Sequence, residues 1–183
     1  MSIISPEEHK LKSGKKVIIR TALAKDAAQV VKIMKDVIKE GPFTLYETDE
    51  YGSTAKSEAK RIKRFKDAPG KIYLVAEVKN EITGFISFNN WDTRRTEHTG
   101  LFSVFLKKKW RALGIGSMLI RCMLAWGKIN PINKKVSLAV FSTNKSAIAL
   151  YKKLGFRQEG YCPRDMIING QYVDSILMYK YTK

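Results

Sequence analysis

The sequence predicts an α/β fold in which about four helices cover a mixed, mostly antiparallel sheet of six to seven strands. The chain has 183 residues, the size of one domain. Hydrophobic residues make up 44% and charged residues 28%, as in ordinary globular proteins, which excludes a disordered or collagen-like chain. Segments with the two-residue period of strands alternate with segments of helical period, and the chain ends in a hairpin pattern.

The elements follow one another without a linker or internal repeat, so residues 1–183 are expected to form one domain. The polar residues 1–14 are expected to be a loose N-terminal arm. Runs of apolar and β-branched residues predict strands at 17–22, 72–78, 82–89, 96–106, 136–141, 156–168 and 172–181. Apolar residues at helical spacing predict helices at 26–40, 53–66, 115–129 and 144–154.

Turn and capping signals mark several ends of these elements. Asp26, with Gln29 three residues later, is a weak capping-box pattern at the start of the first helix. Gly41 and Pro42 end that helix. The Asn-Gly pair at 169–170 predicts a tight turn between the last two strands.

The composition limits the classes of partner. Lys and Arg total 34 and Asp and Glu total 17, so the net charge of +17 favours anionic partners without choosing among them. Cys122 and Cys162 cannot form a disulfide scaffold, and with only two histidines no metal is expected. There is no signal-peptide pattern and no apolar stretch near the roughly 18 residues of a membrane span. A cytoplasmic protein with no membrane partner is therefore expected.

The most informative segment is LKKKWRALGIGS, which runs from Leu106 to Ser117 and joins a strand to a long helix. Its glycines let backbone N–H groups approach a ligand closely, and the helix N-terminus adds about half a positive charge. Neither a Walker A nor a Rossmann glycine pattern occurs. Taken alone, the segment is as consistent with a tight turn as with a phosphate site.

A second segment follows the next strand. Asn144 and Tyr151 are seven residues apart, which is two helical turns, so they lie on one face. An amide and a phenol would then line the same cleft. The alternative is that Asn144 caps the helix and Tyr151 is a half-buried core aromatic.

Together these segments resemble the GNAT superfamily of acyl-CoA-dependent N-acetyltransferases, over about residues 17–181. The pattern Arg-x-x-Gly-x-Gly at 111–116 is similar to the family's pyrophosphate loop, and the run Asn…Tyr…Gly-Phe at 144–156 to its second signature. The resemblance implies a GNAT-like sheet that splays between its fourth and fifth strands, those ending at Leu106 and spanning 136–141. Residues 94–100 and 168–174 resemble the branch of phosphinothricin and L-amino-acid acetyltransferases.

The resemblance implies acetyl-CoA as the acetyl donor. Backbone groups of Val104 and Leu106 would pair with its pantetheine arm, and Asn144 would hydrogen-bond that arm or an ordered water. Backbone N–H groups would hold the pyrophosphate at Arg111, Ala112, Gly114, Ile115, Gly116 and Ser117.

The resemblance also implies direct attack of a neutral amine on the thioester in a ternary complex. Tyr151 would act on the leaving thiolate as a general acid, or at least as a strong hydrogen-bond donor. The position where the family often carries a base is Gly100, which cannot act. His98 lies two residues away on the same face of a regular strand and is the expected base, with Glu97 as the alternative if a bulge shifts the register.

The expected acceptor is a small molecule with a primary amine, such as an amino acid. Its site would be built from residues 40–52, 90–100 and 163–170. Glu40 would attract a cationic amine and Phe43 would supply an apolar wall. A carboxylate would be held in two-pronged fashion by Arg94, with Arg95 or Arg164 as alternatives.

Two other functions remain open on the sequence. One is a protein N-terminal acetyltransferase of ribosomal-protein type. The other is a basic nucleic-acid-binding protein on a GNAT scaffold, suggested by the Lys and Arg residues of 60–66. The intact 111–116 loop and Tyr151 favour catalysis, so nucleic acid is not the expected partner. By analogy with the family, an edge strand near 172–181 could pair in a homodimer.

Overall fold

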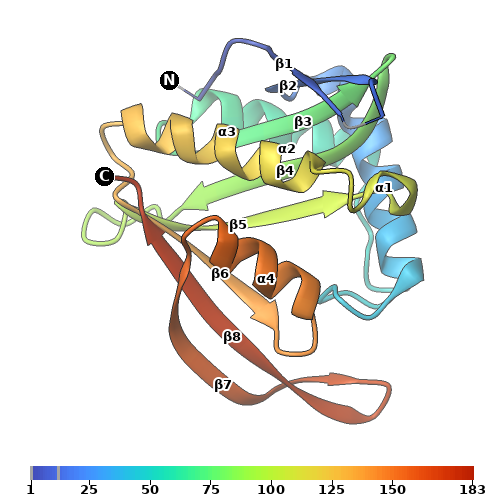
Figure 1. Cartoon of the computed structure of the whole chain (residues 1–183), viewed down its shortest axis with the longest axis vertical. Coiled ribbons are helices and arrows are strands. Elements are labelled where there is room, and N and C mark those ends of the chain that lie inside the picture. The colour runs from blue at the N-terminus through green and yellow to red at the C-terminus, as the bar shows by residue number, and fades with distance from the viewer. Residues whose placement is uncertain (1, 12) are drawn as a thin grey trace.

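One sheet of eight strands runs through the molecule. The computed structural model describes residues 2–11 and 13–183 (Figure 1). The strands are β1 (Glu7–Lys10), β2 (Lys16–Thr21), β3 (Ile72–Val78), β4 (Glu81–Asn90), β5 (Thr99–Leu106), β6 (Lys135–Phe141), β7 (Arg157–Ile168) and β8 (Gln171–Tyr181). The helices are α1 (Ala27–Glu40), α2 (Ala55–Asp67), α3 (Ile115–Ile129) and α4 (Lys145–Lys153), with 3₁₀ turns η1 (Ala24–Asp26) and η2 (Lys108–Trp110).

The spatial order of the strands is β1-β2-β3-β4-β5-β6-β8-β7, and only β5 and β6 are parallel. The predicted mixed, mostly antiparallel sheet with four helices is therefore confirmed. The sheet has one strand more than the upper predicted number. Because β8 lies between β6 and β7, the expectation that residues 172–181 form an edge is wrong, and β1 and β7 are the edges.

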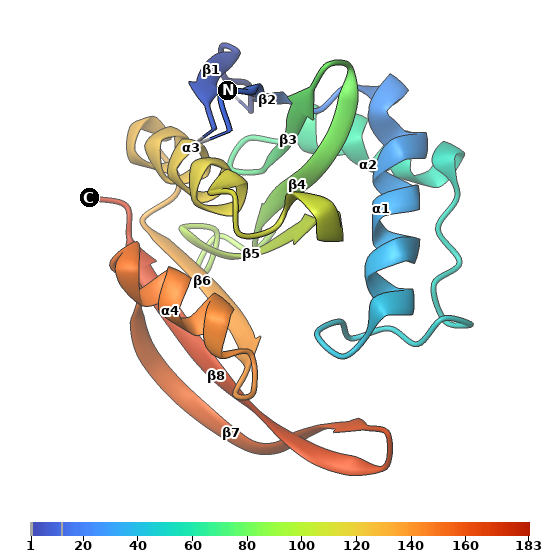
Figure 2. The ribbon, with the colours of Figure 1, turned by 45° about the vertical axis from the view of Figure 1, so that its right-hand side comes forward.

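Helices cover both faces of the sheet. Figure 2 shows α1 and α2 on one side and α3 and α4 on the other. Two buried clusters fill the spaces between, one under α3 and α4 and one under α1 and α2. Strand β3 contributes side chains to both clusters, because Leu74 belongs to the first cluster and Tyr73 and Val75 belong to the second. No helix in the described ranges is long and apolar enough to cross a membrane.

The N-terminal segment differs from the expected loose arm. Glu7 to Lys10 pair antiparallel with Ile19 to Lys16 as strand β1, and Leu11 is buried within the first cluster. The polar run Glu-Glu-His-Lys has no apolar alternation, so the sequence carries no strand signal there. Of the predicted arm, residues 1 and 12 lie outside the described part.

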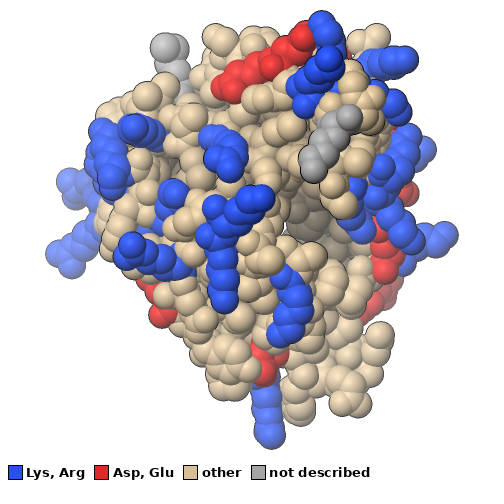
Figure 3. Space-filling view, viewed as in Figure 1, with Lys and Arg blue, Asp and Glu red and all other residues tan. Residues whose placement is uncertain are grey.

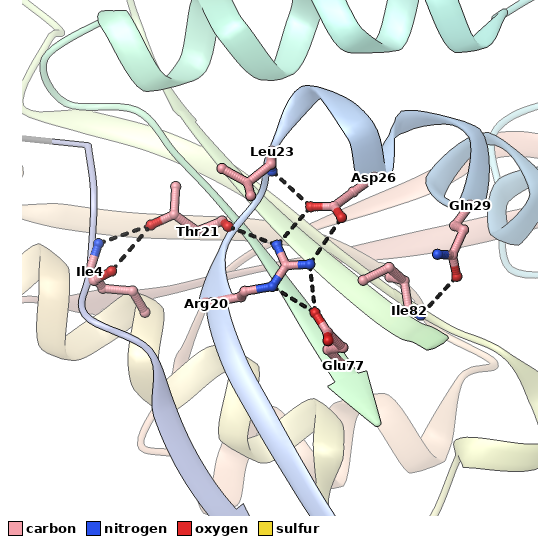
Figure 4. Close-up of polar contacts among 8 residues, drawn as sticks. All are labelled: Ile4, Arg20, Thr21, Leu23, Asp26, Gln29, Glu77 and Ile82. Atoms are coloured by element: carbon pink, nitrogen blue, oxygen red, sulfur yellow. Dashed lines mark hydrogen bonds and ion pairs between the residues drawn. The ribbon is translucent and has the colours of Figure 1, made fainter. Parts of the chain in front are cut away.

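A charged cluster fixes the start of α1 (Figure 4). The guanidinium of Arg20 lies 2.7 Å from Asp26 and 2.6 Å from Glu77, so it joins β2, η1 and β3. The Asp26 side chain makes no capping bond to α1, and Gln29 instead accepts the backbone N–H of Ile82 at 2.9 Å. The predicted capping box is therefore wrong, because the Arg20 guanidinium takes the Asp26 carboxylate.

The sheet opens between β5 and β6. These strands pair only from Thr99 opposite Lys135 to Leu101 opposite Ser137, whereas β5 stays paired with β4 as far as Leu106. One edge of β5 beyond Leu101 is therefore separated from β6. The predicted splay is confirmed, and it falls between the fifth and sixth strands because β1 adds one to the count.

Candidate active site

The open edge of β5 presents backbone groups to the gap. Lys107 donates its N–H to the carbonyl of Thr83 in β4 at 3.0 Å. Successive residues of a strand direct their N–H and C=O groups to opposite edges. Val104 and Leu106 therefore direct their N–H and C=O groups toward the other edge, where β6 has diverged. The carbonyl of Leu106 accepts Nε of Arg111 at 3.0 Å. The two residues predicted to bind a pantetheine arm thus have backbone groups facing the splay.

The loop into α3 gathers backbone donors. Ala112 has φ of +60° and Gly114 has φ of +89°, and these two left-handed residues turn the chain sharply into the helix. The N–H of Met118 donates to the carbonyl of Gly114 at 3.1 Å and is the first helical donor, so the N–H groups of residues 115–117 have no partner within the helix. Their N–H groups, together with the positive end of the helix dipole, form a site that suits an anion.

The two glycines of this loop have different reasons to be glycine. A Cβ on Gly114 would meet only Met118, at 3.8 Å, so its positive φ is what requires glycine. Gly116 is buried, and a Cβ there would lie 3.3 Å from Leu106 and 3.8 Å from Leu150. Gly116 therefore lets α3 approach β5 and α4, in addition to its expected backbone role.

Basic side chains surround this loop. Figure 3 shows Lys and Arg gathered on the face that carries α3 and α4. Exposed members from the loop and these helices are Lys108, Lys109, Arg111, Arg121, Lys128, Lys145, Lys152 and Lys153. Some of this charge is already paired, because Lys107 and Lys109 lie 2.8 and 3.0 Å from Glu81. Arg111 lies 2.7 Å from Glu40, at the end of α1. The remaining positive charge favours a phosphate-bearing ligand.

Tyr151 is held by packing. Its ring contacts Phe102 of β5 and Phe156 edge-on, with centroids 5.8 and 5.9 Å away, and the residue is 9% exposed. Burial raises the pKa of Tyr151 to about 12, so the phenol stays protonated at physiological pH. No group of the described residues hydrogen-bonds its hydroxyl. A proton donor is therefore available beside the open edge of β5.

Asn144 is the N-cap of α4, as the capping alternative expects. Its Oδ1 accepts the N–H of Ala147 at 3.2 Å and the hydroxyl of Ser146 at 3.1 Å. This oxygen is committed to the helix. Within the described chain the amide nitrogen has no such bond, so only Nδ2 is available to donate to a ligand.

A cavity of about 460 Å³ lies between the end of α1, the loop after it and the β7–β8 hairpin. It is lined by residues from 38–47 and 166–169 and by Phe141 at the end of β6. Glu40 and Glu47 make one wall acidic. Phe43 does not line the cavity directly, but its ring packs edge-on against Phe141, with centroids 5.9 Å apart. Two of the three segments predicted for the acceptor site are thus brought together.

The third predicted segment lies elsewhere. His98 directly precedes β5, and its carbonyl accepts the N–H of Lys135 at the start of β6. Phe141, which lines the cavity, is six residues further along β6, or roughly 20 Å at the usual rise of a strand. Figure 1 shows the β4–β5 loop at this opposite end of the sheet. Arg94, Arg95 and His98 belong to that loop and are exposed. The structure therefore does not bring Arg94 to the cavity as a clamp or His98 there as a base.

Arg164 is the one of the three arginines predicted as carboxylate clamps that lies near the cavity. It lies in a bulge of β7, with φ of +53°, two residues before Met166 of the cavity wall. Its N–H donates to Asp174 at 2.8 Å, and its guanidinium lies 5.3 Å from the ring centroid of Tyr172. Sequence reasoning missed Phe141, which lies outside the three predicted segments. The available signal was that Phe141 ends the strand beside the splay.

Comparison with known proteins agrees with this geometry. Residues 39–156 match the acetyltransferase (GNAT) family. The chain is 31% identical to the L-amino acid N-acetyltransferase AaaT of Escherichia coli, covering 63% of this chain and 71% of that protein. It is 29% identical to an N-alpha-acetyltransferase of Sulfurisphaera tokodaii, covering 80% of this chain and 84% of that protein. It is also 29% identical to the spermidine N(1)-acetyltransferase of E. coli, covering 57% of this chain and 55% of that protein.

Solved structures share the fold. The GNAT-family acetyltransferase of Streptococcus pneumoniae superposes with a TM-score of 0.87 at 28% identity, covering 90% of this chain and 99% of that one. A putative acetyltransferase of Salmonella typhimurium, solved with its cofactor acetyl-CoA, gives 0.83 at 19% identity, covering 91% and 94%. The family match over residues 39–156 covers more than half of the chain, and the splayed sheet and the 111–116 loop agree with it. The chain therefore belongs to the GNAT family of N-acetyltransferases.

Proposed function

We propose that this protein transfers the acetyl group of acetyl-CoA to the primary amine of a small amino-acid-like molecule. The observation that carries the proposal is the pairing of two sites around one gap in the sheet. An anion-binding loop begins α3 on one face, and an acidic cavity lies beside α1 and the β7–β8 hairpin. The Arg111–Glu40 ion pair supports the proposal, because it joins the loop to the cavity wall.

The residues at the splay fit acetyl-CoA. Backbone groups of Val104 and Leu106 would hold its extended arm, and Nδ2 of Asn144 would donate to the same arm. Free N–H groups at 115–117, with those of Ala112 and Gly114, would hold its pyrophosphate. The N–H of Arg111 already donates to the carbonyl of Lys108 at 3.2 Å. Bound there, acetyl-CoA would supply the acetyl group as a thioester.

Tyr151 would stabilise the departing sulfur as a hydrogen-bond donor. Its pKa of about 12 lies above the ordinary thiol value of ~8.5, so complete proton transfer to a thiolate would be uphill. A retained proton still allows a strong charge-assisted hydrogen bond. The buried ring, fixed by Phe102 and Phe156, aims this donor without the cost of ordering a mobile side chain.

The cavity supports a cationic, compact acceptor. Glu40 and Glu47 would attract an ammonium group into a chain that is otherwise strongly basic. Phe141, with Phe43 behind it, would pack against the acceptor's apolar part. Arg164, two residues from Met166, would pair with a carboxylate.

An acetyl-CoA turnover screen tests the proposal. Amino acids, their decarboxylated amines, polyamines and N-terminal peptides are compared at equal concentration. We expect amino acids to be acetylated faster than the matching amines, and Arg164→Gln to remove that preference. Equal rates for both members of each pair would contradict the carboxylate contact.

The N-terminal acetyltransferase alternative has one specific support. The match to the S. tokodaii relative covers a larger share of both chains than the match to AaaT does. Turnover confined to peptides would select it. Absence of turnover with every acceptor, in protein shown to bind acetyl-CoA, would argue against both candidates.

A further inference from the structure

Three metal-binding types of side chain meet at a place that the acetyl-transfer site does not use. Glu7 and His9 alternate along β1 and so share one face, and Cys122 reaches them from α3. His9 Nε2 lies 3.5 Å from Glu7 Oε2, and Cys122 Sγ lies 3.4 Å from that oxygen and 3.8 Å from the His9 nitrogen.

The three atoms converge on a single point. The point equidistant from them lies about 2.1 Å from each, within the ~2.0–2.3 Å of zinc bonds to oxygen, nitrogen and sulfur. Without an ion, the Cys122 thiol donates a hydrogen bond to Glu7 at 3.4 Å, and the His9–Glu7 contact is long. At 3.5 Å the imidazole and carboxylate are beyond the usual ~2.7–3.2 Å of an N–H···O hydrogen bond.

The donor set indicates the class of ion. A thiolate and an imidazole select zinc-like transition metals over magnesium or calcium, which prefer all-oxygen sites. We propose that Glu7, His9 and Cys122 bind one Zn²⁺ ion, with water in the fourth position. Binding would form the Zn–S bond and release the thiol proton of Cys122 to solvent. The proposal goes beyond acetyl transfer and departs from the expectation of no metal.

The ion would connect elements that are otherwise joined weakly. β1 is an edge strand whose only strand partner in the described sheet is β2. Cys122 is 3% exposed on α3, whereas the Glu7 and His9 side chains are 48% and 31% exposed, so an ion can enter from the β1 side. A bound ion would fasten this edge strand to the helix whose first turn forms the anion site.

Cobalt substitution provides a direct test. Full-length protein is stripped with a chelator, dialysed and titrated with Co²⁺, whose spectrum reports both thiolate bonding and tetrahedral geometry. We expect one Co²⁺ per chain, a near-ultraviolet thiolate charge-transfer band and intense visible bands. Zn²⁺ should displace the cobalt and raise the midpoint of thermal unfolding, because it binds only the folded site.

Variants separate this site from adventitious binding. Cys122→Ser should lose the charge-transfer band. Glu7→Gln and His9→Gln, both at partly exposed positions, should weaken Co²⁺ binding about ten-fold or more, since even outer-shell changes cost about 10–100-fold. Cys162→Ser is the matched control and should keep the spectrum. A missing band in folded wild-type protein, or an unchanged band and affinity in Cys122→Ser or His9→Gln, would overturn the proposal. These readouts do not depend on acetyl transfer.

Discussion

The carboxylate of Glu40, the last residue of α1, lies 2.7 Å from the guanidinium of Arg111 in the loop before α3. Sequence reasoning assigned these residues to different ligands, Glu40 to the acceptor and Arg111 to the donor. Their contact means that a phosphate arriving at the loop would compete with Glu40 for the same guanidinium. Donor and acceptor binding are therefore expected to influence each other through this pair.

Glu40→Gln should tighten acetyl-CoA binding and weaken binding of the amine acceptor. The substitution frees Arg111 for the pyrophosphate, and a partly exposed ion pair contributes about 0–1 kcal/mol, so the gain is at most about five-fold. The Kd of acetyl-CoA from calorimetry and the KM of the acceptor are the measurements.

Glu47→Gln is the matched control for that change. It removes the same charge from the same cavity wall but does not contact Arg111. It should raise the acceptor KM and leave the acetyl-CoA Kd unchanged. If both variants shift the acetyl-CoA Kd equally, general charge and not the ion pair is responsible.

Tyr151→Phe should lower kcat at least about ten-fold and leave the acetyl-CoA Kd nearly unchanged. The hydroxyl has no hydrogen bond to any described residue, and the ring contacts with Phe102 and Phe156 are kept, so the fold should not suffer. Steady-state kinetics with the identified acceptor give the result, and Tyr181→Phe, at an exposed position of β8 outside the cavity, is the control. Turnover equal to wild type would exclude Tyr151 from the reaction.

The raised pKa of Tyr151 also predicts how stability depends on pH. An ordinary tyrosine loses its proton near pH ~10, whereas burial holds Tyr151 protonated to about 12. Between these values the folded state binds a proton that the unfolded chain has lost, so stability falls as pH rises through this window. Tyr151→Phe should reduce that slope by up to about 1.4 kcal/mol per pH unit. Urea unfolding at pH 9, 10 and 11 measures it, and parallel curves for both proteins would contradict it.

Gly114→Ala should weaken acetyl-CoA binding about ten-fold, or about 1.4 kcal/mol. At φ of +89° a Cβ costs roughly 1–2 kcal/mol, and relief of that strain would turn the N–H groups of the loop away from the anion. Gly170→Ala, at φ of +76° in the β7–β8 turn, is the control for strain alone. It should lower the melting temperature similarly without changing the Kd. Equal binding losses in both variants would disprove the placement of Gly114.

The sequence predicted best what depends on local pattern. The bounds of α3 and β3 match the prediction residue for residue, and the Asn-Gly turn at 169–170 has both residues at positive φ as expected. β1 could not be found, because a polar edge strand has no alternating apolar face. The order of β7 and β8 was also missed, since hairpin pattern does not say which strand lies inside.

In the candidate active site, too, local sequence features were predicted and long-range contacts were not. The 111–116 loop and Tyr151 are read from short spacings and lie at the splay. Arg94 and His98 were expected beside residues 40–52, but they precede β5 and lie at the other end of the sheet. The sequence does not say at which end of the sheet a loop lies. The Glu40–Arg111 pair and the Glu7–His9–Cys122 cluster join residues far apart in the chain, so no local pattern contains them.

Because β5 and β6 pair over only a few residues, the rest of β5 has backbone N–H groups that are bonded to β4 and others that are not bonded to any strand. In β5, Ser103 and Phe105 bond toward β4, whereas Val104 and Leu106 point to the open side. Deuterium should therefore exchange in an alternating pattern along this one strand, slow at 103 and 105 and fast at 104 and 106. Saturation with acetyl-CoA should slow the fast pair selectively, so that amide exchange alone would register an occupied splay before any acceptor is known.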